Sequence, residues 1–383
     1  MRTKLKKQGD QCLEQIKQIL ESCNLQSISE GEEGAKFTTL CAAWTRKEQE
    51  GYSFLELPLE NARELIEKAR EYLKIFLSEK KLDFRWSETP IIWRDSLVLK
   101  DETVLPSGSF KDRQTLVLLT IARALNVQGV EIVSCGNAAI SAAYLGRVFE
   151  MPVRVIVPVN VSLDKLKLLQ NLGVQVEQRG ANYEEAYRLT LENLGADGFW
   201  NITPGINPLA ELGLFLIGYE LAQNPDITDV LVPAGNGALL YGIFRGYQLY
   251  SSTYPESNIQ IPRIHAVQIE NLSPLAIALE QNNPLAKADG DPDKTKADAI
   301  AAIESYCLPK ALKAIKTSGG SVILVGDHQI EEIIKVYHDL NLEFSAYSAI
   351  AAAQLLQTQA PTTHNICTIL CAKSPEKRDL LIM

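Results

Sequence analysis

The sequence has few histidines and no paired cysteine motif. Its four histidines (His265, His328, His338 and His364) lack the spacing of metal ligands, and its seven cysteines are scattered without a CxxC pair. This pattern argues against a zinc ribbon and against a disulfide framework. We therefore predict no metal site, reduced thiols and a cytoplasmic location.

Long apolar runs and an excess of basic residues are also missing. The first twenty residues begin basic and then turn rich in Gln and Glu, without the apolar core of a signal peptide, and no window reaches transmembrane length. The 383 residues hold 38 Lys and Arg against 47 Asp and Glu, a formal net charge of −9. Because phosphate backbones are bound by clustered Lys and Arg, we predict neither nucleic acid nor membrane as a partner.

What is present is the composition of a large globular protein, with 46% hydrophobic and 22% charged residues. A chain of this length predicts two lobes or more. From residue 111 onward, helical segments alternate with short β-branched strands such as "GVEIVS" and "VRVIVPV". Strand–helix alternation with short connections predicts an α/β fold with mostly parallel sheets covered on both faces.

Three turns lead from strands or loops into helices, where open α/β sheets bind ligands. The first, "SGSFK" at 107–111, places an amine at a helix start, where the helix dipole disfavours positive charge. Lys111 is either an ordinary solvated side chain or an amine that loses its proton and attacks a carbonyl. The turn alone leaves both interpretations open.

The other two turns are suited to anions. "SCGN" at 134–137 is either a simple capped turn or a set of backbone N–H groups that receives a carboxylate, with the Asn137 amide donating to a phenolic oxygen. "GNG" at 235–237 suits a phosphate monoester, because its glycines allow a close approach to an anion and the sequence has neither GxGxxG nor a Walker lysine. An aldehyde, a phenolate and a phosphate together describe pyridoxal 5′-phosphate (PLP).

Ordered motifs extend this hypothesis. "LPSGSFKDR", "SCGN", "PAGNG", "HAVQIE", "KTKADAI" and "EFSAYSA" resemble fold-type-II PLP enzymes, and among them the threonine synthase family. The resemblance implies a tryptophan synthase β-like fold of two three-layer lobes with mostly parallel sheets, PLP as the cofactor, a small amino-acid substrate and a homodimer. The predicted domains are 1–122 (N-terminal helices and the start of the large PLP domain), 123–203 (small α/β domain) and 204–383 (the rest of the large domain).

The resemblance also implies roles for individual residues. Lys111 is the Schiff-base lysine and proton shuttle, and Asn137 contacts the ring hydroxyl of the cofactor. The remaining residues bind the substrate (Ser107, Ser134, Asn137 and Ala138), the cofactor phosphate (Gly235, Asn236, Gly237, Ala238 and Leu239) or the pyridine nitrogen (Cys371).

Two positions depart from the family pattern. Cys371 stands where relatives carry Ser or Thr, and a thiol is a weaker hydrogen-bond partner than a hydroxyl. Ala210 stands where threonine synthases carry an Arg that grips the substrate phosphate, a loss of about 1.5–3 kcal/mol. Lys100 or Arg113 could take the place of that Arg.

The predicted function is a PLP-dependent carbon–oxygen lyase of threonine synthase type, performing β/γ-elimination or replacement on a small amino acid. The family reaction converts O-phosphohomoserine to threonine. The alternatives are a paralogue that uses O-phosphoserine or another activated amino acid, as cysteate synthase does, a serine/threonine ammonia-lyase, and a non-catalytic scaffold. The scaffold is disfavoured because it would have no physical reason to keep an amine at a helix start.

Overall fold

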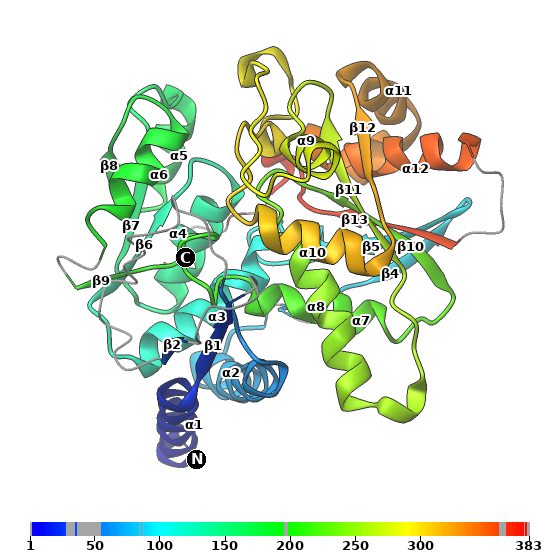
Figure 1. Ribbon diagram of the computed structural model, residues 1–383. Helices are drawn as coiled ribbons and strands as arrows, with labels where there is room; N and C mark the ends of the chain where they lie inside the picture. Colours follow the sequence, from blue (N-terminus) through cyan, green and yellow to red (C-terminus); the bar gives the residue numbers. More distant parts are fainter. Residues whose placement is uncertain are drawn as a thin grey trace. The chain divides into compact units, whose positions relative to one another are not determined.

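The chain divides into two compact units (Figure 1). The computed structural model describes residues 2–27, 35–36, 55–83, 85–86, 88–194, 198–359, 365–378 and 380. Unit 1 comprises Met1–Trp86, Lys111–Gly213 and Leu380–Met383, and unit 2 comprises Ser87–Phe110 and Leu214–Asp379. The chain therefore crosses between the units several times, and one crossing falls directly before Lys111.

Unit 1 contains a four-stranded sheet in the order β8-β7-β6-β9, and all of its pairings are parallel. Every residue of β6 and β7 is buried, as expected for parallel strands covered on both faces. Helices α4, α5 and α6 pack against this sheet, and α3 packs against α4. The elements are β6 (Gly129–Val133), β7 (Val153–Val157), β8 (Gln175–Gln178), β9 (Phe199–Asn201), α3 (Lys111–Ala124), α4 (Asn137–Val148), α5 (Leu163–Asn171) and α6 (Tyr183–Leu191).

The N-terminal part of unit 1 adds α1 (Arg2–Ser22) and α2 (Leu59–Lys80), which pack against each other and against α3. A small antiparallel sheet is formed by β1 (Asn24–Ser27), β2 (Ala35–Lys36) and β3 (Leu55–Glu56). Its strand order is β2-β1-β3. Cys12, Ile16, Leu20 and Cys23 are buried and repeat at helical spacing. Three of these residues form an apolar stripe along α1, and Cys23 directly follows the last residue of the helix, Ser22.

Unit 2 contains a six-stranded sheet in the order β12-β11-β10-β13-β5-β4. All pairings are parallel except β4 with β5, so the prediction of mostly parallel sheets is confirmed. Because β10, β13 and β5 run in parallel, their carboxyl ends meet at one edge of the sheet. The strands are β4 (Ile91–Arg94), β5 (Leu97–Asp101), β10 (Ile227–Pro233), β11 (Arg263–Ile269), β12 (Val322–Val325) and β13 (Asn365–Leu370).

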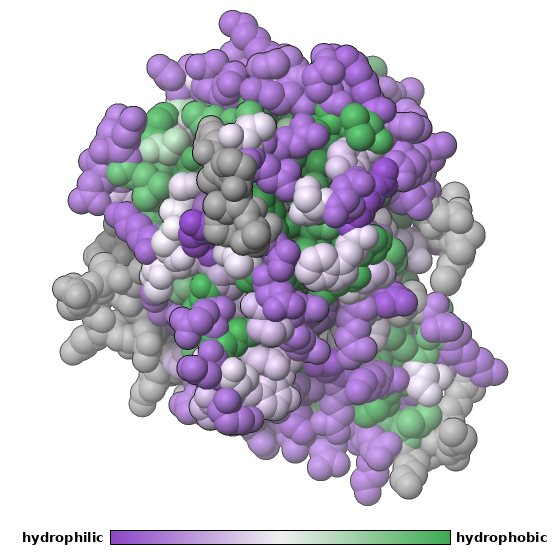
Figure 2. Space-filling model, turned by 90° about the vertical axis from the view of Figure 1, so that its right-hand side faces the viewer, coloured by the Kyte–Doolittle hydropathy of each residue, from purple (hydrophilic) through white to green (hydrophobic). Residues whose placement is uncertain are grey.

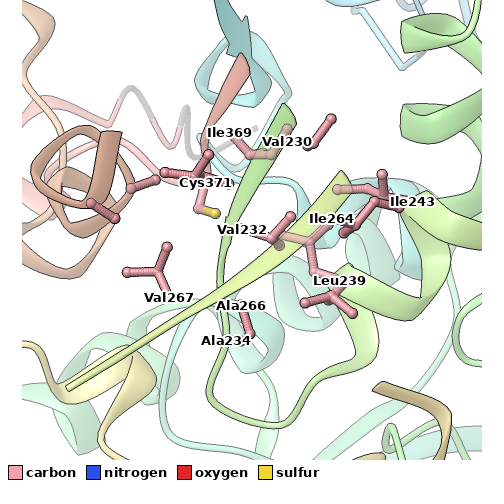
Figure 3. Packing of buried hydrophobic residues seen from close by; sticks show 14 of the residues in the cluster. Val230, Val232, Ala234, Leu239, Ile243, Ile264, Ala266, Val267, Ile369 and Cys371 are labelled. Atoms are coloured by element: carbon pink, nitrogen blue, oxygen red, sulfur yellow. The ribbon is translucent and has the colours of Figure 1, made fainter. Parts of the chain in front are cut away.

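Helices cover both faces of the unit 2 sheet. Figure 1 shows α7, α8 and α10 on one face and α11 and α12 on the other. The core forms between these layers, where side chains of the strands, among them Val232 and Ile264, pack with Leu239 and Ile243 of α8 (Figure 3). The helices are α7 (Phe215–Leu221), α8 (Ala238–Thr253), α9 (Pro274–Gln281), α10 (Leu308–Ser318), α11 (Asp327–Tyr337) and α12 (Ser348–Gln359).

Hydrophilic side chains cover most of the face drawn in Figure 2, with smaller hydrophobic areas between them. Within the described ranges, no helix is long and apolar enough to cross a bilayer. Nor do three His, Cys, Asp or Glu side chains gather as metal ligands in that part of the chain. The six cysteines placed by the structure are all free thiols.

The bounds of the two units differ from those of the three predicted domains. Helix α3 stays with residues 123–203 in unit 1, because it packs against α4 and against the N-terminal helices α1 and α2. The later boundary falls after Gly213, where the sequence placed it after residue 203. As separately folding domains, the segments 1–122, 123–203 and 204–383 stay a prediction.

Candidate active site

In unit 1, Lys111 and Asn137 are the first residues of α3 and α4. The hydroxyl of Ser141, one turn after Asn137, donates to Asp112 Oδ1 at 2.6 Å and lies 2.8 Å from Thr115 Oγ1. Asp112 and Ser141 are both fully buried. These hydrogen bonds hold the beginnings of the two helices side by side, so that Lys111 and Asn137 start from neighbouring points.

The electrostatics of this corner favour an anion. Two helix N-termini lie side by side here, and each contributes a partial positive charge from its helix dipole. The cap residue of α4 is Gly136, and no side chain caps that helix. Ser134 Oγ instead accepts from the Gly136 amide at 3.2 Å, and Ala138 is 9% exposed. The corner therefore suits a carboxylate, and Lys111 beside it is half-buried.

In unit 2, the Gly235–Gly237 loop connects β10 to α8. Gly237 caps α8 at φ +85°, in the left-handed region that favours glycine, and no side chain caps the helix. A Cβ added at Gly235 would lie 3.1 Å from the Ala299 carbonyl oxygen, so a side chain there would be crowded. The first helical residues, Ala238 and Leu239, are apolar and buried, and only their backbone can bind an anion. This glycine loop with an uncapped helix start fits a phosphate monoester.

The loop is held in place by the segment that begins α10. Ser305 Oγ donates to the Gly235 carbonyl at 2.5 Å. The Cys307 amide donates to both the side-chain oxygen of Asn236, at 3.0 Å, and its carbonyl oxygen, at 3.1 Å. The side chain and the backbone of Asn236 thus both brace the loop against the segment that begins α10.

Cys371 directly follows β13, at the sheet edge where β10 also ends. Leu231 lies opposite Thr368 in the parallel register, and continuing that register places Cys371 opposite Ala234. The Cys371 carbonyl accepts from the Phe110 amide at 3.0 Å. The Cys371 side chain is 5% exposed and lies within the packed cluster of unit 2 (Figure 3). The structure thus places Cys371 and the glycine loop at one edge.

The turn that precedes Lys111 is bound to the same edge. Ser109 bridges Ala372, and the Lys373 amide donates to the Gly108 carbonyl at 2.8 Å. The hydroxyls of Ser107 and Ser109 are 3.5 Å apart, and both residues are fully buried. Ser107 therefore lies inside unit 2, where it supports the turn.

The three positions at which a cation could bind a substrate phosphate, 210, 100 and 113, are all buried. Ala210 is 0% exposed, and Arg113 is 1% exposed. Lys100 is fully buried on β5, where its ammonium donates to Glu220 Oε2 at 2.6 Å and to the Thr89 carbonyl at 2.7 Å. Lys100 thus forms an ion pair with Glu220 in the core.

The structure divides the predicted site residues into two groups. One group lies at the helix starts of unit 1 (Lys111, Ser134, Asn137 and Ala138), and the other at the sheet edge of unit 2 (Ser107, Gly235, Asn236, Gly237, Ala238, Leu239 and Cys371). That both groups hold one ligand stays a prediction. Sequence reasoning missed the supporting residues, among them Ser141 and Ser305; the spacing of Ser141, four residues after Asn137, was the one local signal.

Comparison with known proteins identifies the family. A threonine synthase of Methanosarcina acetivorans is 27% identical over 76% of this chain and 73% of its own length. An L-threonine ammonia-lyase of Thermotoga maritima is 28% identical over 62% of this chain and 57% of its own. The solved structure of threonine deaminase isoform 2 from Solanum lycopersicum covers 75% of this chain and 79% of its own, with a TM-score of 0.62 and 24% identity, and shows the same fold.

A family model described as pyridoxal-phosphate dependent enzyme matches residues 85–372, which include the glycine loop, both helix starts and Cys371. The cofactor of this chain is pyridoxal 5′-phosphate. With three quarters of its length in that match, the chain belongs to the pyridoxal-phosphate-dependent enzyme family.

Proposed function

We propose that this enzyme eliminates the hydroxyl group of a small β-hydroxy amino acid such as serine or threonine, as a lyase that releases ammonia. The observation that carries the proposal is the pair of helix starts in unit 1, held together by the Ser141–Asp112 hydrogen bond at 2.6 Å. They supply an amine and a carboxylate-binding corner at neighbouring points, the two groups that elimination from an amino acid requires.

The chain's own residues would share the work as follows. Lys111 would hold PLP through its amine and then carry the proton taken from Cα. The backbone N–H groups at the start of α4, with Ser134 and Asn137, would bind the substrate carboxylate, and the Asn137 amide would donate to the cofactor's ring oxygen. The loop from Gly235 to Leu239 would bind the cofactor phosphate, and Cys371 would face the ring nitrogen. PLP supplies the electron sink that stabilises negative charge at Cα.

The preference for an unphosphorylated substrate comes from the buried cations. A phosphate leaving group needs a charge-assisted partner, which contributes about 1.5–3 kcal/mol. Ala210 offers no charge, Lys100 is committed to Glu220, and Arg113 is buried. In the overall reaction, water leaves across the Cα–Cβ bond, and hydrolysis of the released enamine takes up one water and yields a 2-oxo acid and ammonia.

Threonine synthase activity on O-phosphohomoserine is the second candidate. It is favoured by the similarity to a threonine synthase that extends over 73% of that relative's length. A water molecule would then add to the substrate after the phosphate leaves. The two candidates differ in the product that is released, ammonia or inorganic phosphate.

The experiment measures both products. Purified enzyme is incubated with L-serine, L-threonine, O-phosphoserine and O-phosphohomoserine, and ammonia, 2-oxo acid and phosphate are assayed. We expect ammonia and 2-oxo acid from the hydroxy amino acids and no phosphate from the esters. Phosphate release from an ester without turnover of serine or threonine would refute the proposed substrate. Lys111→Ala should abolish the yellow absorption band that borohydride bleaches in the wild-type protein.

We also propose that the enzyme works as a homodimer in the cytoplasm. The dimer rests on the family resemblance and on the exposed edge strand β4, where Ile92 is 39% and Trp93 58% exposed. Light scattering on the purified protein should give twice the mass of the chain, and a monomer mass would contradict it.

A further inference from the structure

Three short segments meet at the carboxyl edge of the unit 2 sheet. The turn 107–110 is joined to 371–373 by the Ser109–Ala372 bridge. On the other side of 371–373, Leu342 bridges Lys373, and the Glu343 amide donates to the Ala372 carbonyl at 3.1 Å. The segment after β13 is thus the middle of a three-part arrangement.

The side chain of Arg378 reaches all three segments. Its Nε donates to the Lys373 carbonyl at 2.9 Å, and its Nη2 lies 3.5 Å from Glu343 Oε2. Its aliphatic stem packs on Gly108, where an added Cβ would lie 3.1 Å from Cγ and 3.3 Å from Cδ. The Arg378 side chain is 1% exposed, so the guanidinium is buried at the centre of the arrangement.

A buried guanidinium is retained only where its hydrogen bonds offset the loss of hydration. Glu343, whose side chain is 16% exposed, supplies the compensating charge. Arginine is suited to this place because its planar fork can donate in several directions at once, whereas a lysine ammonium is a single point charge on a flexible stem. The residue type therefore matches a role as a tie between segments.

The tie acts where two predicted site residues begin. The Phe110 amide, one residue before Lys111, donates to the Cys371 carbonyl at 3.0 Å. Gly108, on which Arg378 packs, is in the left-handed region at φ +78° and has no side chain of its own to fix the turn. Loss of Arg378 would loosen the turn from 371–373 and release the backbone from which the Lys111 side chain leaves.

We propose that Arg378 is a positioning residue that fixes the turn before Lys111 against the segment carrying Cys371. This inference rests on the proposed function of Lys111 as the residue that holds the cofactor. In this proposal Arg378 acts through the Gly108–Lys373 and Phe110–Cys371 hydrogen bonds.

The first measurement uses the cofactor-free protein. Hydrogen exchange of peptides that contain the Phe110 and Lys373 amides is compared between wild type, Arg378→Met and Arg94→Met. Arg94 is the matched control, because it forms a fork with Asp339 at 2.7 and 3.1 Å on the surface of the same unit. We expect faster exchange at both amides in R378M and none of this change in R94M. Unchanged protection in R378M would overturn the proposal.

The second measurement is the equilibrium binding of PLP and the pH titration of its visible absorption. We expect R378M to bind PLP roughly tenfold more weakly, because small displacements of a reacting group have effects of this size or larger, and to shift the titration. R378K should recover part of the loss. If R378M lowers only the unfolding midpoint and leaves the affinity and the titration unchanged, the role is structural and the proposal is wrong.

Two further variants keep the outcomes separate. If R378M does not fold, Glu343→Gln tests the same tie with the arginine in place. This variant should show a smaller change than R378M in the hydrogen exchange of the two amides and in the affinity for PLP. Wild-type behaviour of both E343Q and R378K would contradict the tie. If K111A still forms the borohydride-sensitive band, the proposed function itself has failed. If K111A is colourless and R378M matches the wild type, only the role of Arg378 is wrong.

Discussion

Replacement of Lys100 by methionine tests whether this cation belongs to the core or to the substrate. Methionine keeps the apolar stem but removes the ammonium that donates to Glu220 and to the Thr89 carbonyl. The Glu220 carboxylate, 9% exposed, would lose its cation and keep the hydrogen bond from the Glu88 amide at 2.8 Å. Removing one partner of a buried ion pair destabilises a protein by about 3–5 kcal/mol, and we expect K100M to lose this much.

The double variant Lys100→Met/Glu220→Gln separates the pair from its parts. Glutamine is neutral and can still accept from the Glu88 amide, so no uncompensated charge remains in the core. We therefore expect the double variant to be more stable than K100M, with a coupling of about 0.5–3 kcal/mol between the two sites. Lys296→Met is the matched control: its ion pair with Glu331 has the same N–O distance of 2.6 Å, but the two side chains are 66% and 45% exposed. Removing it should leave stability unchanged.

Urea unfolding followed by circular dichroism measures these stabilities, and steady-state kinetics on the same preparations measures KM. If K100M is as stable as K296M, the buried-pair reasoning is refuted. If K100M is stable but its KM for a phosphorylated amino acid rises, Lys100 is a substrate ligand, and the preference for unphosphorylated substrates falls with it.

Two titratable groups predict the pH range of stability. Burial acts to raise the pKa of Asp229, but hydrogen bonds from His265, Arg263 and Thr228 outweigh it and hold the pKa below its usual value. The stabilisation from this carboxylate is therefore present above about pH 4 and is lost as the pH falls further. In thermal unfolding, Asp229→Asn should be less stable than the wild type at pH 7, and its stability should fall less steeply in acid; an unchanged acid slope would contradict this. Burial raises the pKa of the Cys367 thiol from 9.0 to about 12, so the stability of the folded protein should fall as the pH rises above 9. Cys367→Ala should make this fall of stability with pH less steep. Rapid reaction of Cys367 with a thiol reagent in the native protein would contradict its burial.

Local patterns were sufficient to predict the helix starts and the parallel sheets. The expected beginning of a helix at Lys111 agrees with the first residue of α3, because the Ser-Gly-Ser turn and the apolar run after it both lie within one short stretch. Ser162 is likewise a local signal, because it directly precedes α5 and its hydroxyl accepts from the Lys165 amide. Such features depend on neighbours a few residues apart and can be predicted from the sequence.

Features that depend on distant residues were not predicted. The antiparallel strand β4 was missed because it has only four residues and its turn depends on Asp95 at φ +53°. The hydrogen bond from Ser305 to Gly235 spans 70 residues, and that from Ser141 to Asp112 spans 29. No local pattern indicates such pairs, which form only when the sheets bring the ends of strands and helices together.

The position of Lys111 in the chain explains why its surroundings can be rigid. Phe110, just before it, is bound through its amide to Cys371 in unit 2, and Asp112, just after it, is bound through its carboxylate to Ser141 in unit 1. Both anchors lie one residue from Lys111, and they hold its backbone whatever the arrangement of the two units. A lysine that must place its amine on one carbonyl carbon benefits from such anchoring, because little motion remains to be lost when the bond forms. The residues on either side of Lys111 are thus each anchored within their own unit, whereas a solvated surface lysine would need neither anchor.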